Sequence, residues 1–159
     1  MPQIIPLHQL ASWRQEQRRL RRKVVATNGC FDLLHVGHLR YLQAARALGD
    51  CLVVGLNGDA SVRELKGPTR PLNPEAERAE LLAALKPVDV VTIFPEKRAV
   101  HFLTELQPDI YAKGGDYTED QLDPDEVAAI RAGGGRIQIL ALVPGKSTSA
   151  LVAKAGLNK

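Results

Sequence analysis

The sequence predicts an α/β protein built on a Rossmann-like, doubly wound, five-stranded parallel sheet in a single domain. Short β-branched or apolar runs alternate with stretches of helical spacing, which is typical of a parallel sheet wrapped by helices on both faces. Residues 51–56 (CLVVGL) are apolar throughout, as expected of a strand that is covered on both sides. With 159 residues, 45% of them hydrophobic, the chain is large enough to bury one such core.

The expected strands are the apolar runs, and the loops that follow them are the places to seek a site. The first strand, residues 23–27 (KVVAT), ends at the turn residues Asn28 and Gly29. The other four cover residues 51–56, 88–93, 110–112 and 137–142. In doubly wound folds, ligands bind beyond the carboxyl ends of the strands. The loops after the first, second, fourth and fifth expected strands are therefore the candidates.

Helices are expected between these strands. Residues 36–48 carry apolar side chains at helical spacing and end at Gly49. A helix over residues 74–85 begins with Asn73 as its N-cap and Pro74 in the first helical position. Further helices are expected over residues 7–19, from about residue 59, over 97–106, from about residue 124 to Gly133, and over 147–155.

The positive charge of the chain is confined to one segment. The net charge is +3, but residues 14–23 (RQEQRRLRRK) hold six basic residues and one glutamate, so the remainder is slightly acidic. We set residues 1–22 apart as an N-terminal helical leader and assign residues 23–159 to the main domain. The basic segment is interpreted as a solvated helix face, because no nucleic-acid motif accompanies it and only 4% of residues are aromatic. Nucleic acid is therefore not an expected partner.

Targeting and metal signals are absent from the sequence. No apolar run reaches the roughly 18 residues that span a bilayer, and the N-terminus lacks the pattern of a signal peptide. The two cysteines, Cys30 and Cys51, have no metal-binding spacing and fit a reducing compartment. We expect a cytoplasmic protein without membrane partners and without metal ligands of its own.

The most informative segment is the loop after the first strand, residues 27–38 (TNGCFDLLHVGH). His35 and His38 lie three residues apart at a helix start, so their side chains share one face. Gly37 leaves room for a ligand near the backbone, and the helix N-terminus adds free N–H groups and a partial positive charge. Two imidazoles in this place can donate hydrogen bonds to phosphate oxygens. The alternative is a pair of capping or surface histidines.

The closing segment, residues 144–149 (PGKSTS), looks like a P-loop but lacks its spacing. A Walker motif needs a glycine five residues before Gly145, and Leu140 stands there. We interpret the segment as a second helix N-terminus, at which the hydroxyls of Ser147 and Thr148 face phosphate. An ordinary Ser/Thr cap is the alternative.

Three further segments carry chemistry suited to phosphorylated ligands. Lys66 and Arg70 lie on a loop rich in Gly and Pro, residues 66–72, that could close on a polyphosphate. Arg78, on the next helix, either points inward to an anion or pairs with neighbouring acids. Residues 113–117 (KGGDY) could surround a base or a ribose, because glycine permits close approach of the backbone.

Together these motifs resemble a known family. The loop of residues 27–38 is similar to the HxGH signature of the cytidylyltransferase-like nucleotidyltransferases, and residues 145–149 are similar to their second phosphate motif. Ser149 departs slightly, since Thr is more familiar there. With residues 65–71 (LKGPTRP) and 113–117, the set resembles more narrowly the subfamily that adenylylates D-glycero-β-D-manno-heptose 1-phosphate. No kinase segment precedes the motifs, so the stand-alone form of that enzyme is expected.

The resemblance implies nucleotidyl transfer, in which a sugar 1-phosphate attacks the α-phosphorus of ATP and yields ADP-heptose and pyrophosphate for lipopolysaccharide synthesis. Mg²⁺ is expected to enter with ATP, and a homodimer is common in the family. The implied catalytic residues are His35, His38 and Lys66. The implied nucleotide-binding residues are Asn28, Gly29, Cys30, Phe31, Gly37, Lys113, Gly115, Asp116, Ser147 and Thr148. Asp32, Arg70 and Arg78 are implied to bind the acceptor, Asp32 and Arg78 alternatively to support the site.

Three other functions stay open at this point. The first keeps the fold and changes the substrates, giving a cytidylyltransferase that acts on glycerol 3-phosphate or another small phosphate. The second is a tRNA-binding module like those of class I synthetases, for which the chain is short. The third is a non-catalytic protein that binds a nucleotide or nucleic acid and uses residues 14–23.

Overall fold

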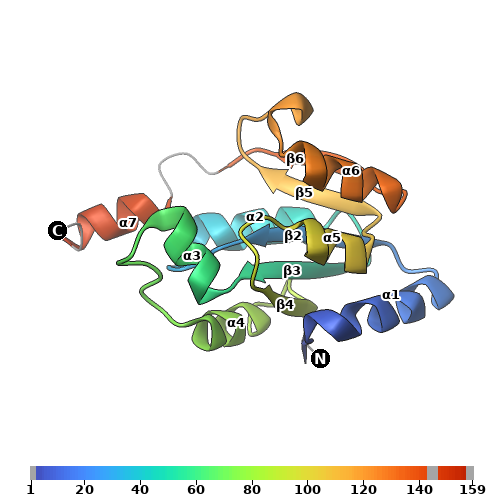
Figure 1. The fold of residues 1–159 in the computed structure, drawn as a ribbon, viewed down its shortest axis with the longest axis horizontal. Coiled ribbons are helices and arrows are strands. Elements are labelled where there is room, and N and C mark those ends of the chain that lie inside the picture. The colour runs from blue at the N-terminus through green and yellow to red at the C-terminus, as the bar shows by residue number, and fades with distance from the viewer. Residues whose placement is uncertain (1–2, 143–146, 157–159) are drawn as a thin grey trace.

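The computed structural model describes residues 3–142 and 147–156 and forms one parallel sheet flanked by helices (Figure 1). The six strands follow the order β1-β4-β3-β2-β5-β6, and every pair of neighbours is parallel. They are β1 (Gln3–Ile4), β2 (Val24–Gly29), β3 (Cys51–Asn57), β4 (Val90–Phe94), β5 (Ile110–Gly114) and β6 (Arg136–Leu140). The doubly wound α/β fold is confirmed, and the prediction of five strands is wrong by one.

The additional strand belongs to the segment that the sequence sets apart as a leader. Strand β1 is only two residues long and pairs with β4 at the sheet edge, Gln3 lying opposite Val90. Ile5, the residue after β1, is also bound to the sheet, because the Thr92 hydroxyl of β4 donates to its carbonyl (2.9 Å). Two residues are too few to show any alternation of polar and apolar side chains, so the pattern could not reveal this strand.

Helices cover both faces of the sheet. Helices α1 (Leu10–Arg19), α5 (Val100–Leu106) and α6 (Pro124–Ala132) pack on one face, and α2 (Val36–Arg46) and α4 (Glu75–Ala83) pack on the other. The remaining helices are η1 (Leu7–Gln9), α3 (Asp59–Lys66), η2 (Glu119–Gln121) and α7 (Thr148–Lys154). Figure 1 shows α7 and α1 at opposite ends of the molecule.

Alternating residues of the central strands supply the two halves of the core. On β2, Ala26 packs toward α1 and α5, whereas Val25 packs toward α2 and α4. Phe102 of α5 sits on Gly55 of β3, where a Cβ would come within 2.7 Å of the ring. A glycine at this position therefore lets α5 approach the sheet.

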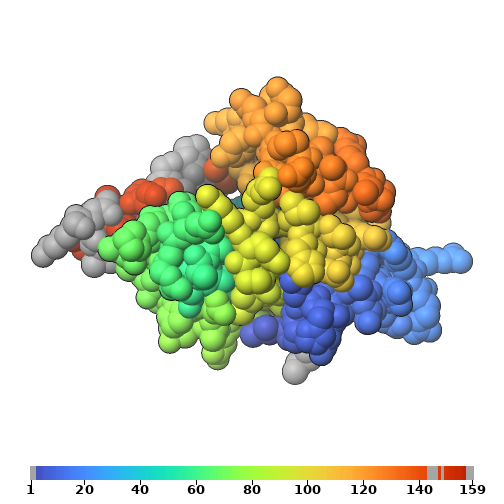
Figure 2. Space-filling view, in the orientation of Figure 1, coloured from blue at the N-terminus to red at the C-terminus, as the bar shows by residue number. Residues whose placement is uncertain are grey.

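The basic segment is partly structural. Arg14 of α1 is buried; its Nη2 lies 3.0 Å from Asp109 and its Nε donates to the Gln107 carbonyl at the end of α5 (3.0 Å). Figure 2 shows the blue N-terminal segment seated against the yellow segment that contains α5. At least one of the clustered arginines is therefore committed to joining α1 to the sheet.

Asn73 was expected to cap α4, but that helix begins at Glu75 with Pro74 as its N-cap and has no side-chain cap. The expectation is wrong because the Asn73 amide donates to the Asp32 carbonyl instead (3.0 Å).

In the described part of the chain, no helix has the length and apolar character needed to cross a bilayer.

Candidate active site

Two adjoining cavities open where β2, β3 and β5 end. The first, of about 320 Å³, is lined by His35, Gly37, Tyr41, Gly114, Leu142 and Ser147. The second, of about 510 Å³, is lined by Asp32, Asn57, Leu65, Arg70, Lys97, Arg98 and Glu126. Eight residues line both: Asn28, Gly29, Cys30, Phe31, His38, Lys66, Lys113 and Ser149. The site therefore has two compartments that share a wall built largely from the loop after β2.

The two histidines are locked together at the start of α2. His35 is the N-cap, and its Nδ1 accepts from the Gly37 backbone N–H (3.1 Å). The His35 backbone N–H donates in turn to Nδ1 of His38 (3.3 Å), and the two rings stack with centroids 3.9 Å apart. Because a backbone N–H occupies each Nδ1, each neutral ring carries its proton on Nε2. The capping contacts thus make Nε2 the proton-bearing nitrogen of each ring when it is neutral, and the Nε2 of His35 is itself buried.

His38 is neutral at physiological pH. Burial, together with the adjacent His35, lowers its pKa from 6.5 to about 4. His38 therefore acts on an anion as a hydrogen-bond donor, and full positive charge comes from other side chains, of which Lys66 and Lys113 line both of the cavities that His38 lines.

Acidification is expected to destabilise the protein through His38. Its pKa is about 4 in the folded state against 6.5 for the ordinary side chain, so the unfolded chain binds more protons between these values. The free energy of unfolding should therefore fall as the pH drops from about 6.5 toward about 4. Urea unfolding at pH 7 and at pH 5 should show a larger loss for the wild type than for His38→Gln. Equal losses would contradict this assignment.

The loop between β2 and α2 adopts an unusual backbone to form the shared wall. Phe31 has a left-handed φ of 43°, and its ring lies 5.4 Å from that of His38. A Cβ on Gly29 would come within 3.0 Å of the Phe31 ring, so glycine lets the phenyl group fold back onto the strand. Beside it, the Tyr111 hydroxyl donates to the Asn28 side-chain oxygen (2.5 Å).

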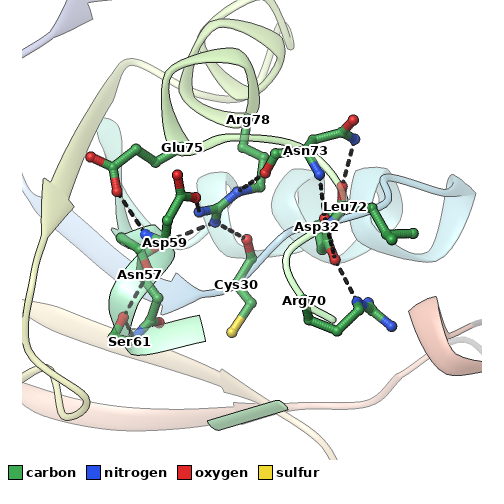
Figure 3. Close-up of polar contacts among 11 residues, drawn as sticks. Cys30, Asp32, Asn57, Asp59, Ser61, Arg70, Leu72, Asn73, Glu75 and Arg78 are labelled. Carbon is green, nitrogen blue, oxygen red and sulfur yellow. Dashed lines mark hydrogen bonds and ion pairs between the residues drawn. The ribbon is translucent and has the colours of Figure 1, made fainter. Parts of the chain in front are cut away.

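Asp32 fastens the loop of residues 67–73 (Figure 3), and Arg70 of this loop lines the second cavity. Its buried carboxylate accepts from the backbone N–H groups of Leu72 (2.9 Å) and Asn73 (3.1 Å) and from Nε of Arg70 (2.6 Å). Burial alone would raise the pKa of this carboxyl, but these three donors together hold it below its usual 3.8. Asp32 therefore supports the site, and Arg70 is the member of this pair that lines the cavity with a cation.

Arg78 lies beneath the cavities and not in them. Its side chain is 0% exposed. The guanidinium donates to the carbonyls of Asn73 (2.9 Å), Cys30 (2.6 Å) and Asn57 (2.9 Å), and to the Asp59 carboxylate (2.7 Å). Figure 3 shows these contacts converging on one guanidinium. Arg78 lines neither cavity, so the structure favours the supporting role over contact with an acceptor.

Most other expected site residues lie at the cavities. Lys66 ends α3, and Lys113 lies near the end of β5. Burial raises the pKa of the Cys30 thiol, which keeps it protonated. Asp116 is exposed and, like Gly115, lies outside both lining sets.

The segment before the last helix is only partly described. Ser147 caps α7, its hydroxyl oxygen accepting from the Ala150 backbone N–H (3.0 Å), and it lines the first cavity. Thr148 begins that helix, but its side chain lies outside the described residues. Residues 143–146, which include Gly145 and Lys146 of the expected motif, lie outside them as well.

Sequence reasoning missed one whole wall of the site. The loop after β4 brings Lys97 and Arg98 to the second cavity, where Glu126 of α6 joins them. Strand β4 corresponds to the third expected strand, and the loop after that strand was not among the four candidate loops. The Lys-Arg pair directly after an apolar strand was the available signal. On the first cavity, Tyr41 was missed because it lies inside the expected helix of residues 36–48, outside the loop that carries the motif.

The described residues contain no cluster of three or more His, Cys, Asp or Glu side chains that could hold a metal ion. The one deeply buried carboxylate at the cavities, that of Asp32, is engaged by Arg70 and two backbone N–H groups. The described part of the site therefore fits a metal ion that enters on the phosphates of a ligand, rather than one held by the protein.

Comparison with known proteins gives consistent matches. The sequence model of the cytidylyltransferase-like family matches residues 26–142. Proteins named bifunctional protein HldE are similar: that of Rhodopseudomonas palustris is 52% identical over 92% of this chain and 29% of its own length. That of Citrifermentans bemidjiense is 55% identical over 84% of this chain and 27% of its length. The chain thus spans less than a third of these relatives.

A solved structure agrees with these matches. The lipopolysaccharide core biosynthesis protein of Thermoplasma volcanium superposes with a TM-score of 0.63 at 32% identity, covering 77% of this chain and 97% of that one. The similarity therefore extends from the sequence to the fold over nearly all of a shorter protein.

Proposed function

The chain belongs to the cytidylyltransferase-like family of nucleotidyltransferases, and from that premise we propose that it transfers the AMP moiety of ATP to D-glycero-β-D-manno-heptose 1-phosphate. The products are ADP-heptose and pyrophosphate. The single observation that best supports this proposal is the position of His38 on the wall shared by two cavities. A donor at such a junction can reach an atom that lies between two substrates.

ATP is assigned to the first cavity. His35 and His38 contact the triphosphate, and Lys66 adds the positive charge that the neutral His38 ring lacks. The base and ribose lie toward Gly114, where a Cβ would come within 3.0 Å of the Tyr41 ring, so the glycine keeps this end open. Ser147 and Thr148 remain proposed contacts of the β- and γ-phosphates.

The acceptor is assigned to the second cavity, beside Arg70. Its phosphate oxygen attacks the α-phosphorus of ATP in line, a new P–O bond forms, and pyrophosphate leaves. An ionised phosphate needs no base to deprotonate it, which fits a site whose thiol and imidazole offer no nucleophile–base pair. The protein then accelerates transfer by holding the reactants in line and by stabilising charge on the transferring group.

A divalent metal accompanies ATP in this proposal, and we assign it as Mg²⁺ bound chiefly by phosphate oxygens and water. We also propose a homodimer in solution, to be tested by sedimentation.

The heptose acceptor is supported by about 50% identity to proteins named HldE and by similarity to a lipopolysaccharide core biosynthesis protein. Pyrophosphate release should be measured with each nucleoside triphosphate against a panel of sugar phosphates. ATP with the heptose 1-phosphate should exceed every other pair by about tenfold or more. Preference for CTP with glycerol 3-phosphate would replace this function with the related cytidylyltransferase, and no release with any pair would overturn both.

A further inference from the structure

The loop after β4 is fixed at three points along residues 96–99. The Asn57 side-chain amide donates to the carbonyls of Glu96 (3.5 Å) and Lys97 (3.4 Å). The next residue, Arg98, forms ion pairs with Asp123 and Asp125 of the α6 N-terminus, both at 2.9 Å. The backbone N–H of Ala99 donates to Glu126 (2.8 Å). A short exposed loop held in this way presents its side chains in a defined place.

These contacts leave one cation of the loop uncompensated. Arg98 is neutralised by its two carboxylate partners, whereas Lys97 forms no ion pair with any residue in the described ranges. Both line the second cavity. The loop is thus held through the backbone of Lys97 and the side chain of Arg98. The Lys97 ammonium group therefore stays available for an anion.

The cations around the site differ in which cavity they line. Lys66 and Lys113 line both cavities, so either can act on the nucleotide. Arg70 lines the second cavity but is paired with Asp32 at 2.6 Å. Lys97 lines the second cavity and not the first, and it lacks a carboxylate partner among the described residues. Lys97 therefore offers an anion in the second cavity a positive charge that does not line the first cavity.

We propose that Lys97 is a specificity-determining residue that binds the anionic acceptor in the second cavity. The inference rests on the proposed function, because it takes the second cavity as the acceptor compartment. The acceptor class that this residue selects is a phosphomonoester, whose dianion gains a charge-assisted hydrogen bond from the ammonium group. Uncharged sugars lack that interaction and bind weakly.

The test compares Lys97→Ala, Lys97→Arg and Lys97→Glu in the full chain with heptose 1-phosphate as acceptor. Loss of one charge-assisted contact should raise the acceptor KM by about ten- to a hundredfold, while the KM for ATP stays within about threefold of the wild type. Arginine should restore most of the affinity and glutamate should lower it further. Lys86→Ala is the matched control, because this lysine is exposed and lines neither cavity.

The outcomes separate the two claims. If the wild type turns over heptose 1-phosphate and Lys97→Ala leaves its KM unchanged, the inference about Lys97 is overturned and the proposed function stands. If the wild type uses a different phosphomonoester, the proposed substrate fails, and a raised KM of Lys97→Ala for that compound still supports the inference. If no acceptor in the panel is used, both are overturned. Equal increases in the KM for ATP and for the acceptor would also overturn the inference.

Discussion

Replacement of His38 by alanine should lower kcat for pyrophosphate release by about 100- to 1,000-fold, the usual cost of losing one donor to a charged transition state. The imidazole lies on the wall between the two cavities, and its Nδ1 is occupied by the His35 backbone N–H. Nε2 is therefore the nitrogen that carries the proton and can donate to a ligand. Steady-state kinetics with saturating ATP and acceptor measures the effect.

Two further variants make this result specific. Glutamine carries an amide N–H of similar reach, so His38→Gln should recover part of the lost rate if donation is what matters. His8 is exposed and lines neither cavity, which makes His8→Ala the matched control with expected wild-type kinetics. A kcat of His38→Ala within a few-fold of the wild type would remove His38 from the transition state.

Replacement of Arg78 by methionine should lower the free energy of unfolding by about 3–5 kcal/mol, because three carbonyl oxygens and the Asp59 carboxylate lose their donor together. The side chain is fully buried, so water cannot readily take its place. Urea unfolding with an unchanged slope measures the loss, and Arg40→Met on the exposed face of α2 is the matched control.

Arg78→Lys keeps the folded protein accessible to assay. Lysine retains the positive charge but lacks the planar guanidinium group, so its ammonium can donate hydrogen bonds to only some of the four acceptors. We expect an intermediate loss of stability and a fall in kcat even at temperatures where the variant is fully folded, since the loops after β2 and β3 lose their common anchor. Wild-type stability in both Arg78 variants would show that the guanidinium is dispensable.

The fold could be predicted from the sequence because its strongest patterns, apolar strand runs and helical spacing, are regular. Continuous apolar strands such as residues 51–56 and helices of correct spacing leave few arrangements, and the right-handed crossover rule narrows them further. The elements that were not predicted are either short or depend on contacts between segments that lie far apart in the sequence. Strand β1 has two residues, and the start of α4 depends on Asp32, some 40 residues earlier in the chain.

The candidate site was predictable where one segment carries several ligand-binding features at once. The loop of residues 27–38 combines glycine, two histidines and a helix start, and it forms the shared wall. Local spacing does not determine where a single arginine side chain points, which is why the sequence left Arg78 open between contact with an anion and a supporting role. Lys97 gave no motif, because its importance comes from partners on β3 and α6 that fix the loop around it.

Three of the four groups that Arg78 holds are main-chain oxygens, those of Cys30, Asn57 and Asn73. Any amino acid can supply a carbonyl, so exchange of these three side chains leaves the anchoring intact. Two of the three residues, Cys30 and Asn57, line the second cavity. The contacts of Arg78 therefore do not depend on which side chains these three residues carry, so changes to the Cys30 side chain in the cavity leave the Arg78 anchor in place.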